Sequence, residues 1–333
     1  MIGMFVLVIS GSDVSKIPGV SIAGSNPEVI PYTAPADADM LLWGKPHVID
    51  AIPVDPQGHP TPAIITRAAI CEAEFPVLIV RSGTYLPPIV PYVEMNVHPG
   101  RDPQIDQAIS GVELLIEKSK SLGRVLGKSS KKIVIAESLP GGTTTAYLVL
   151  KALGYNGMVS SASPINPIQL KDQIWENTAK RVGIKFGDLH GKPIDAIREL
   201  GDPMQATVFG MVTGILDKTD IILAGGTQML AVAALLRQAG YDKSLLVATT
   251  TYVVGDKYAH FLDLAKQIQV DIYSAPLDFS QSPFPGLADY EKGYVKEGVG
   301  AGGAVWYAEQ LGVSPNRIIK KTEQLYQAMV KKS

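Results

Sequence analysis

The clearest indication of the fold is residues 132–145, which read KIVIAESLPGGTTT. A short apolar run comes first, a Pro-Gly-Gly turn follows, and three threonines begin the next segment. Short apolar runs bounded by Pro and Gly are typical of buried strands, and small polar residues commonly begin helices. The stretch therefore predicts a strand, a tight turn and a helix in succession.

The same succession recurs on both sides of this stretch. Strands are predicted at residues 1–9, 76–80, 132–136, 157–160, 220–224, 245–248 and 269–273. Helices are predicted from about Pro167, from Asp202-Pro203 and from about Pro315. Alternating short apolar strands and helices predict a doubly wound, mainly parallel, Rossmann-like α/β sheet with helices on both faces.

Two stretches of the N-terminal part give further expectations. Asp102-Pro103 supplies a cap and a first-turn proline, so a helix is expected through Ile116, ending near Gly123 or Gly127. Residues 31–39 contain two prolines and are expected to be largely loop, because proline restricts both itself and its predecessor.

Composition bounds the class of protein. The 333 residues are 46% hydrophobic with a formal net charge of −2, which gives no broad attraction for nucleic acid or anionic lipid. The single cysteine excludes an intrachain disulfide and fits a reducing, cytoplasmic setting. We expect one α/β catalytic domain over residues 1–333, with a divergent, loop-rich part at 1–130 and a C-terminal helical element at 307–333. Neither a membrane span nor a signal peptide is evident.

Small polar residues follow four of the predicted strands. They are Gly141 to Thr145, Ser160-Ser161, Gly225-Gly226-Thr227 and Thr249-Thr250-Thr251. Ligands of doubly wound sheets bind outside the carboxyl ends of strands, where glycines and helix N-termini accept phosphate. Ordinary turn chemistry explains any one of these loops, but the four together favour a phosphate-binding crevice that includes Gly226 and Thr250.

Common sequence motifs narrow the possible functions of this crevice. The Walker pattern GxxxxGK[ST] is absent, and residues 298–303 match GxGxxG without a preceding buried strand, so an NAD-dependent oxidoreductase is a weak alternative. The five histidines form no HxH or HxxxH pair, and no metal site is expected. Two carboxylates, Glu137 and Glu297, adjoin glycine-rich turns; by spacing alone a capping or helix-end role explains each of them better than a catalytic one.

At these residues the sequence resembles the nicotinate-nucleotide–dimethylbenzimidazole phosphoribosyltransferase family. Residues 137–145 are similar to the family's Gly-Glu-x-Gly-x-x-Asn-Thr-Thr loop, and residues 294–301, YVKEGVGA, to its Arg-Leu-Gly-Glu-Gly-Thr-Gly-Ala. Lys171 falls where the family has a lysine. Gly225 lies at a predicted strand end that is similar to the family's strand ending in Asp-Gly-Phe. The resemblance covers residues 131–310, in order along the chain.

The resemblance implies a reaction and a site. The phosphoribosyl group of nicotinate mononucleotide would pass to an aromatic N-heterocycle such as 5,6-dimethylbenzimidazole, giving an α-ribazole phosphate and nicotinate, with no cofactor. Glu297 would be the base and Glu137 would position the acceptor. Phosphate and ribose would be held by Gly141, Gly142, Thr143, Thr144, Ser160, Ser161, Lys171 and Gly225, with Gly298 beside the base. The family is typically dimeric, so a homodimer is expected.

The chain departs from the family pattern at three positions. Tyr294 replaces an arginine, Lys296 a glycine, and Thr143 the loop asparagine. A non-catalytic nucleotide-binding or regulatory protein on the same fold is therefore the alternative. The unusual N-terminal part also leaves open another acceptor, such as adenine.

Overall fold

The computed structural model describes residues 3–24, 26–51, 53–215 and 218–331. Seven strands in these residues form one sheet, in which every neighbouring pair is parallel. The strands are β1 (Met4–Ser10), β2 (Val77–Ser82), β3 (Val93–Glu94), β4 (Lys132–Ser138), β5 (Asp220–Ala224), β6 (Leu246–Thr250) and β7 (Asp271–Ala275). Their order across the sheet is β3-β2-β1-β4-β5-β6-β7.

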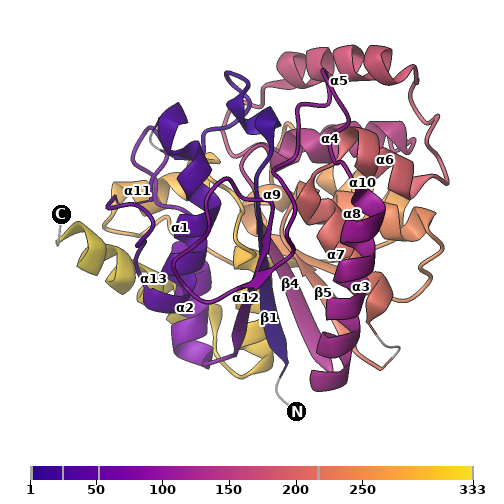
Figure 1. Cartoon of the computed structure of the whole chain (residues 1–333). Coiled ribbons are helices and arrows are strands. Elements are labelled where there is room, and N and C mark those ends of the chain that lie inside the picture. The colour runs from indigo at the N-terminus through magenta and orange to yellow at the C-terminus, as the bar shows by residue number, and fades with distance from the viewer. Residues whose placement is uncertain (1–2, 25, 52, 216–217, 332–333) are drawn as a thin grey trace.

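Helices cover both faces of the sheet (Figure 1). One face carries α1 (Ile30–Trp43), α2 (Ala63–Ala73), α12 (Ala301–Gln310) and α13 (Pro315–Val330). The other carries α3 (Val112–Ser129), α4 (Gly142–Ala152), α5 (Ile168–Val182), α6 (Pro193–Leu200), α7 (Pro203–Gly214), α8 (Thr227–Gln238) and α10 (Phe261–Ile268). Shorter elements are α9 (Thr251–Val254), α11 (Pro285–Ala288) and the 3₁₀ turns η1 (Asp13–Lys16), η2 (Pro27–Val29) and η3 (Asp289–Lys292).

Each face of the sheet has its own hydrophobic core. In β1, Val6 and Val8 belong to the core under α3 and α7, whereas Phe5 and Leu7 belong to the core under α1, α2 and α12. Successive side chains point to opposite faces, so a strand covered on both sides must be apolar throughout. This requirement explains the continuous apolar runs of the sequence.

The strand order places a crevice at β1 and β4. The chain adds β2 and β3 on one side of β1, then crosses to add β4 to β7 on the other. The loops that leave β1 and β4 therefore diverge at their carboxyl ends, which is where ligands bind in such sheets. The doubly wound α/β fold predicted from the sequence is confirmed.

Most predicted elements are present with small shifts in their bounds. The strands expected at 76–80, 132–136, 220–224, 245–248 and 269–273 are β2, β4, β5, β6 and β7, and the helices expected near Pro167, Asp202 and Pro315 are α5, α7 and α13. Residues 1–2 of the first predicted strand and 332–333 of the C-terminal element lie outside the described residues. None of the helices in the described ranges combines the length and hydropathy needed to cross a bilayer.

The loop predicted at residues 31–39 is wrong, because this stretch forms most of α1. Pro31 lies in the first turn, where a backbone donor has no intrahelical partner. Pro35 lies inside the helix, at a cost of about 3 kcal/mol. Ala34 and Leu41 are almost completely buried against the sheet, and this packing stabilises the helix despite the prolines.

The helix predicted from Asp102 is also misplaced. Asp102 caps a turn instead, accepting from the N–H of Gln104 at 2.9 Å, and α3 begins only at Val112. The helix then passes through Gly123 to Ser129. A Cβ on Gly123 would lie 2.1 Å from the carbonyl oxygen of Met211, so this glycine permits close contact with α7 and does not end the helix.

Residues 157–160 do not form the predicted strand. The N–H of Met158 donates to Nδ1 of His260 (2.9 Å), and its carbonyl accepts from the backbone N–H of His260 (2.8 Å). The N–H of Ser160 donates to the hydroxyl of Thr227 (3.1 Å). Side chains and a distant loop thus satisfy these backbone groups in place of a strand ladder.

Candidate functional site

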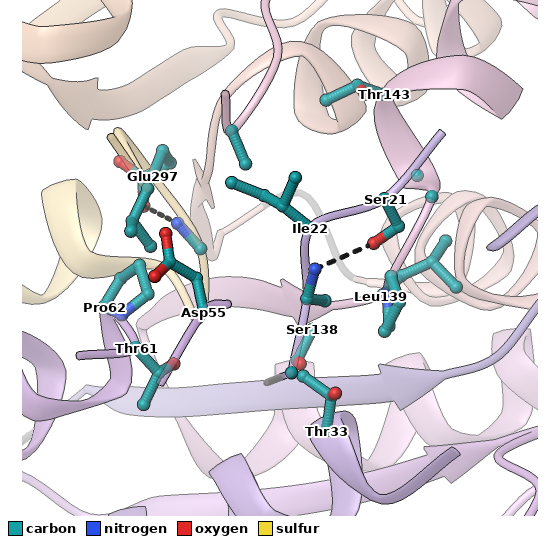
Figure 2. A pocket seen from close by; sticks show the side chains of 18 of the residues that line it. Ser21, Ile22, Thr33, Asp55, Thr61, Pro62, Ser138, Leu139, Thr143 and Glu297 are labelled. Atoms are coloured by element: carbon teal, nitrogen blue, oxygen red, sulfur yellow. Dashed lines mark hydrogen bonds between the residues drawn. The ribbon is translucent and has the colours of Figure 1, made fainter. Parts of the chain in front are cut away.

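A pocket of about 260 Å³ lies at the carboxyl end of β4, between the loops that follow β1 and β5. Its wall combines segments that are far apart in the chain: residues 19–24, 29–37, 49–62, 137–143, 160–167, 226–228 and 295–299 contribute lining residues. In Figure 2, Glu297, Asp55 and Pro62 lie on one side of the pocket, and Ser21, Leu139 and Thr143 lie on the other. The pocket occupies the position that the strand order predicts.

Glu297 lies in the wall of this pocket, just before α12. Its carboxylate accepts from the N–H groups of Gly298 (3.1 Å) and Gly302 (3.3 Å) and from the hydroxyl of Thr249 (3.3 Å). Burial raises its pKa to about 7, although these three donors act in the opposite direction. A carboxyl group with a pKa near neutrality, open to a pocket, is suited to general base catalysis.

Glu137 is the second carboxylate of the pocket and lies at the end of β4. It is 2% exposed. Burial raises its pKa well above the ordinary value, and the negative charges of Glu297, Asp202 and Asp37 raise it further. Burial and the neighbouring charges thus favour the protonated form of Glu137, in which it can donate a hydrogen bond.

Asp37, from α1, is a third carboxylate that sequence reasoning missed. It lines the pocket and accepts from the hydroxyls of Ser138 (2.7 Å) and Thr61 (2.9 Å). Burial raises its pKa to about 7. Among the described residues, no lysine, arginine or histidine forms an ion pair with Asp37, Glu137 or Glu297.

Two lysines hold another part of the wall, which we call the serine loop (residues 160–163): Lys171 lies behind the wall, and Lys296 lines the pocket. Nζ of Lys171 donates to the carbonyl oxygen of residue 160 at 2.9 Å. Nζ of Lys296 donates to the carbonyl oxygens of residues 161 and 163 at 2.7 and 2.8 Å. The N–H of Val295 bonds the remaining carbonyl, that of residue 162, at 2.8 Å.

These contacts orient the N–H groups of the serine loop. In a trans peptide each N–H points away from the preceding carbonyl. Since the carbonyls face the lysines, the N–H groups of Ser161 and Ala162 point the other way, and both residues line the pocket. Within the described ranges neither N–H has a hydrogen-bond acceptor. The loop therefore offers free donors to an anion.

Both lysines are strongly desolvated. Lys171 is 0% exposed, and burial together with the nearby charge of Lys296 lowers its pKa to about 7, against a smaller opposing effect of Asp256. Burial also lowers the pKa of Lys296, and Asp256, whose Oδ2 is 3.3 Å from Nζ, partly offsets this. An anion bound at the serine loop would favour the protonated form of both lysines.

The structure brings most of the predicted site residues together. The pocket is lined by Glu137, Gly141, Gly142, Thr143, Ser160, Ser161, Gly226, Glu297 and Gly298. The others lie behind its wall: Thr144, Lys171, Gly225 and Thr250. The hydroxyl of Thr250 donates to the carbonyl of Lys296, and that of Thr144 is buried without a partner in the described structure. These four residues do not line the pocket, so any part they take in binding is indirect.

His59 is another pocket residue without a sequence signal. Its Nδ1 is 2.7 Å from Asp55 and its Nε2 3.1 Å from Asp289, and its ring stacks on Tyr294 at 4.0 Å. Asp289 lies 230 residues away along the chain, so only the fold brings the pair together. Among the described residues, no group of three or more His, Cys, Asp or Glu side chains has the arrangement of a metal site.

Comparison with known proteins identifies close relatives. The UPF0284 protein of Pyrococcus furiosus is 53% identical over 332 residues, which cover 99% of this chain and 100% of that protein. The UPF0284 proteins of Thermococcus kodakarensis and Sulfurisphaera tokodaii are 50% and 42% identical, over 99% and 97% of this chain and 98% and 93% of their own. No protein-family model matches the chain.

Solved structures share the fold at low identity. The nicotinate-nucleotide-dimethylbenzimidazole phosphoribosyltransferase of Thermus thermophilus aligns with a TM-score of 0.61 at 15% identity, covering 98% of this chain and 83% of that one. A structure of CobT from the same organism aligns with a TM-score of 0.60 at 16% identity, covering 98% and 84%. At this identity the likeness establishes the common fold.

Proposed function

The chain belongs to the UPF0284 protein family, and from that premise we propose that it is a phosphoribosyltransferase. It moves the 5-phosphoribosyl group of nicotinate mononucleotide to a benzimidazole-type base, producing an α-ribazole phosphate and nicotinate. The observation that carries this proposal is Glu297, a carboxylate with a pKa of about 7 in the wall of the crevice. The shared fold with a structure named for this reaction supports it.

The two sides of the pocket suit the two substrates. The serine loop, with free N–H groups and the two lysines that hold it, fits the phosphate of the donor. Gly141, Gly142 and Thr143 lie at the start of α4, whose N-terminus adds to the attraction for an anion. Glu137 and Glu297 then face the N–H-bearing acceptor.

The chemistry balances without a further reactant. A ring nitrogen of the acceptor attacks C1′ of the ribose, and the bond from C1′ to the pyridinium nitrogen of the donor breaks. The electron pair of that bond neutralises the ring nitrogen, and nicotinate leaves. Glu297 takes the proton from the other ring nitrogen of the acceptor, so the product carries no added charge. Positioning and base catalysis together supply the acceleration.

The test is acceptor-dependent release of nicotinate. Purified protein is incubated with nicotinate mononucleotide and with benzimidazole, 5,6-dimethylbenzimidazole or adenine, and nicotinate and the ribosylated base are quantified by chromatography. We expect equal amounts of the two products, and no release when the acceptor is omitted. Tight binding of the mononucleotide without release for any acceptor would instead establish the non-catalytic alternative.

A further inference from the structure

Lys296 lines the pocket, holds the serine loop through its side chain and precedes Glu297 in the chain. The residue is 5% exposed, and its ammonium group reaches three acceptors, the carbonyls of residues 161 and 163 and Oδ2 of Asp256. An ammonium group has three donors, so all of them are used. The next residue is Glu297, whose carboxylate faces the pocket. The anchor of the serine loop and the base are thus consecutive residues.

Asp256 extends the same network. Its side chain is 3% exposed, and its Oδ2 accepts from the hydroxyl of Ser160 at 2.6 Å besides pairing with Lys296. Lys296 and Asp256 therefore hold the serine loop through three of its four residues. Such a buried, fully bonded network has little freedom to rearrange, and a shift of the loop must displace Lys296 as well.

The backbone around Glu297 depends on these contacts. Val295 and Val299 have φ angles of +59° and +55°, which β-branched residues rarely adopt. Such a conformation persists only where surrounding contacts impose it. Val295 is fixed by its N–H bond to the serine loop, and Val299 by the hydroxyl of Thr66, which donates to its carbonyl at 2.9 Å. The position of Glu297 is thus determined from both ends.

We propose that Lys296 is a positioning residue that couples the two substrate positions. A phosphate monoester at the serine loop strengthens the existing bonds between the loop and the Lys296 ammonium, and Lys296 thereby holds Glu297 in place for the N–H acceptor. The inference depends on the proposed function for the identity of the two ligands.

Binding without turnover tests this coupling. Ribose 5-phosphate has the phosphate and ribose of the donor but no nicotinate to release. Benzimidazole is titrated by calorimetry into the wild-type protein with and without saturating ribose 5-phosphate. We expect at least about fivefold tighter binding when the sugar phosphate is present. In Lys296→Met, a neutral side chain of similar length, the ratio of affinities should fall to near one.

Two further variants make the outcome decisive. Lys292→Met removes an exposed lysine that pairs with Asp289, and should keep the wild-type ratio. Asp256→Asn removes the partner of Lys296 and should lower the ratio even if Lys296→Met does not fold, which thermal unfolding will reveal. A ratio of one in the wild type, or an unchanged ratio in a folded Lys296→Met and in Asp256→Asn, overturns the inference.

The same proteins separate this inference from the proposed function. If the wild type releases nicotinate but both variants keep the wild-type affinity ratio, the coupling is wrong and the proposed function stands. If the wild type shows the coupling and the variants lose it, but no acceptor releases nicotinate, Lys296 links two ligand positions and the proposed phosphoribosyltransferase activity is wrong. In an active protein, Lys296→Met should also lower kcat more than it raises KM for the donor.

Discussion

The two sides of the pocket differ in how their buried charges are satisfied. What we call the carboxyl side consists of Asp37, Glu137 and Glu297, with which no cation of the described chain pairs; Asp55, the fourth carboxylate of the pocket, contacts His59 instead. The lysine side consists of Lys171 and Lys296, which donate to backbone carbonyls, to Asn166 and to Asp256. Burial moves the pKa values on both sides toward neutrality, upward for the acids and downward for the lysines.

The difference indicates which ligand each side is built to meet. The lysines already have acceptors, and an anion in front of the serine loop adds to their stabilisation. The carboxyl groups lack cationic partners, so a ligand that brings N–H groups supplies what the protein does not. A charge-separated pocket of this kind fits an anionic donor beside a neutral, N–H-bearing acceptor.

The largest expected effect comes from removing the base on the carboxyl side. With its amide oxygen in the place of Oε1, Glu297→Gln still accepts from the N–H groups of Gly298 and Gly302 but cannot take a proton. We expect a loss of about 10³-fold in kcat, with little change in the affinity for nicotinate mononucleotide. Single-turnover nicotinate release and calorimetry measure the two quantities.

The matched control is Glu176→Gln, which alters an exposed carboxylate on α5. It should retain wild-type activity. If a folded Glu297→Gln also remains fully active, the base lies elsewhere, and the carboxyl side loses its assigned role.

The second prediction concerns stability. Burial raises the pKa of Asp37 from 3.8 to about 7, so ionising it in the folded protein becomes unfavourable as pH rises between these values. Asp37→Asn is neutral throughout and should therefore stabilise the protein more at pH 8 than at pH 5, by about 3 kcal/mol. Urea unfolding at the two pH values measures this. The exposed Asp278→Asn serves as control, and an equal gain at both pH values would contradict the burial argument.

Asp37 also shows the limit of what can be predicted from the sequence. Residues 132–145 specify β4, its turn and α4 because apolar runs and Pro-Gly turns are local signals. Pro31 and Pro35 are equally local signals and led to the wrong structure, because the stability of α1 comes from packing against the sheet. Asp37 could not be predicted as a pocket residue once its helix was missed.

Of the two residues of the lysine side, only Lys171 was predicted from the sequence, for a related reason. Lys171 was found through a family resemblance, and Glu297 through the glycines that follow it. Lys296 reaches serine-loop carbonyls 135 and 133 residues away, and no spacing in the sequence indicates such a contact. The strand predicted at 157–160 was wrong for the same reason, since long-range contacts replace the ladder that a strand would need.

The third prediction concerns the pH dependence of the reaction and involves both sides of the pocket. Glu297 must lose its proton to act, and its pKa is about 7. The rate should therefore rise about 50-fold from pH 5 to pH 7 and level off above it. Lys171, also with a pKa of about 7, loses its proton over the same range, so kcat/KM for the donor should fall above pH 7 while kcat stays level. Initial rates of nicotinate release from pH 5 to 9 check this, and a rate that is flat below pH 7 contradicts the assignment of Glu297.

The smallest effect tests the lysine side alone. A dianionic phosphate near Lys171 favours its ammonium form, so nicotinate mononucleotide binding at pH 8 should take up part of a proton. Lys171→Met should weaken binding about tenfold and abolish this uptake. Calorimetry in two buffers of different ionisation enthalpy measures both, with the exposed Lys180→Met on the same helix as control. If a folded Lys171→Met still takes up the proton, Lys171 is not the group that gains it, and Lys296, whose pKa burial also lowers and whose Nζ bonds the serine loop, is the remaining lysine that can.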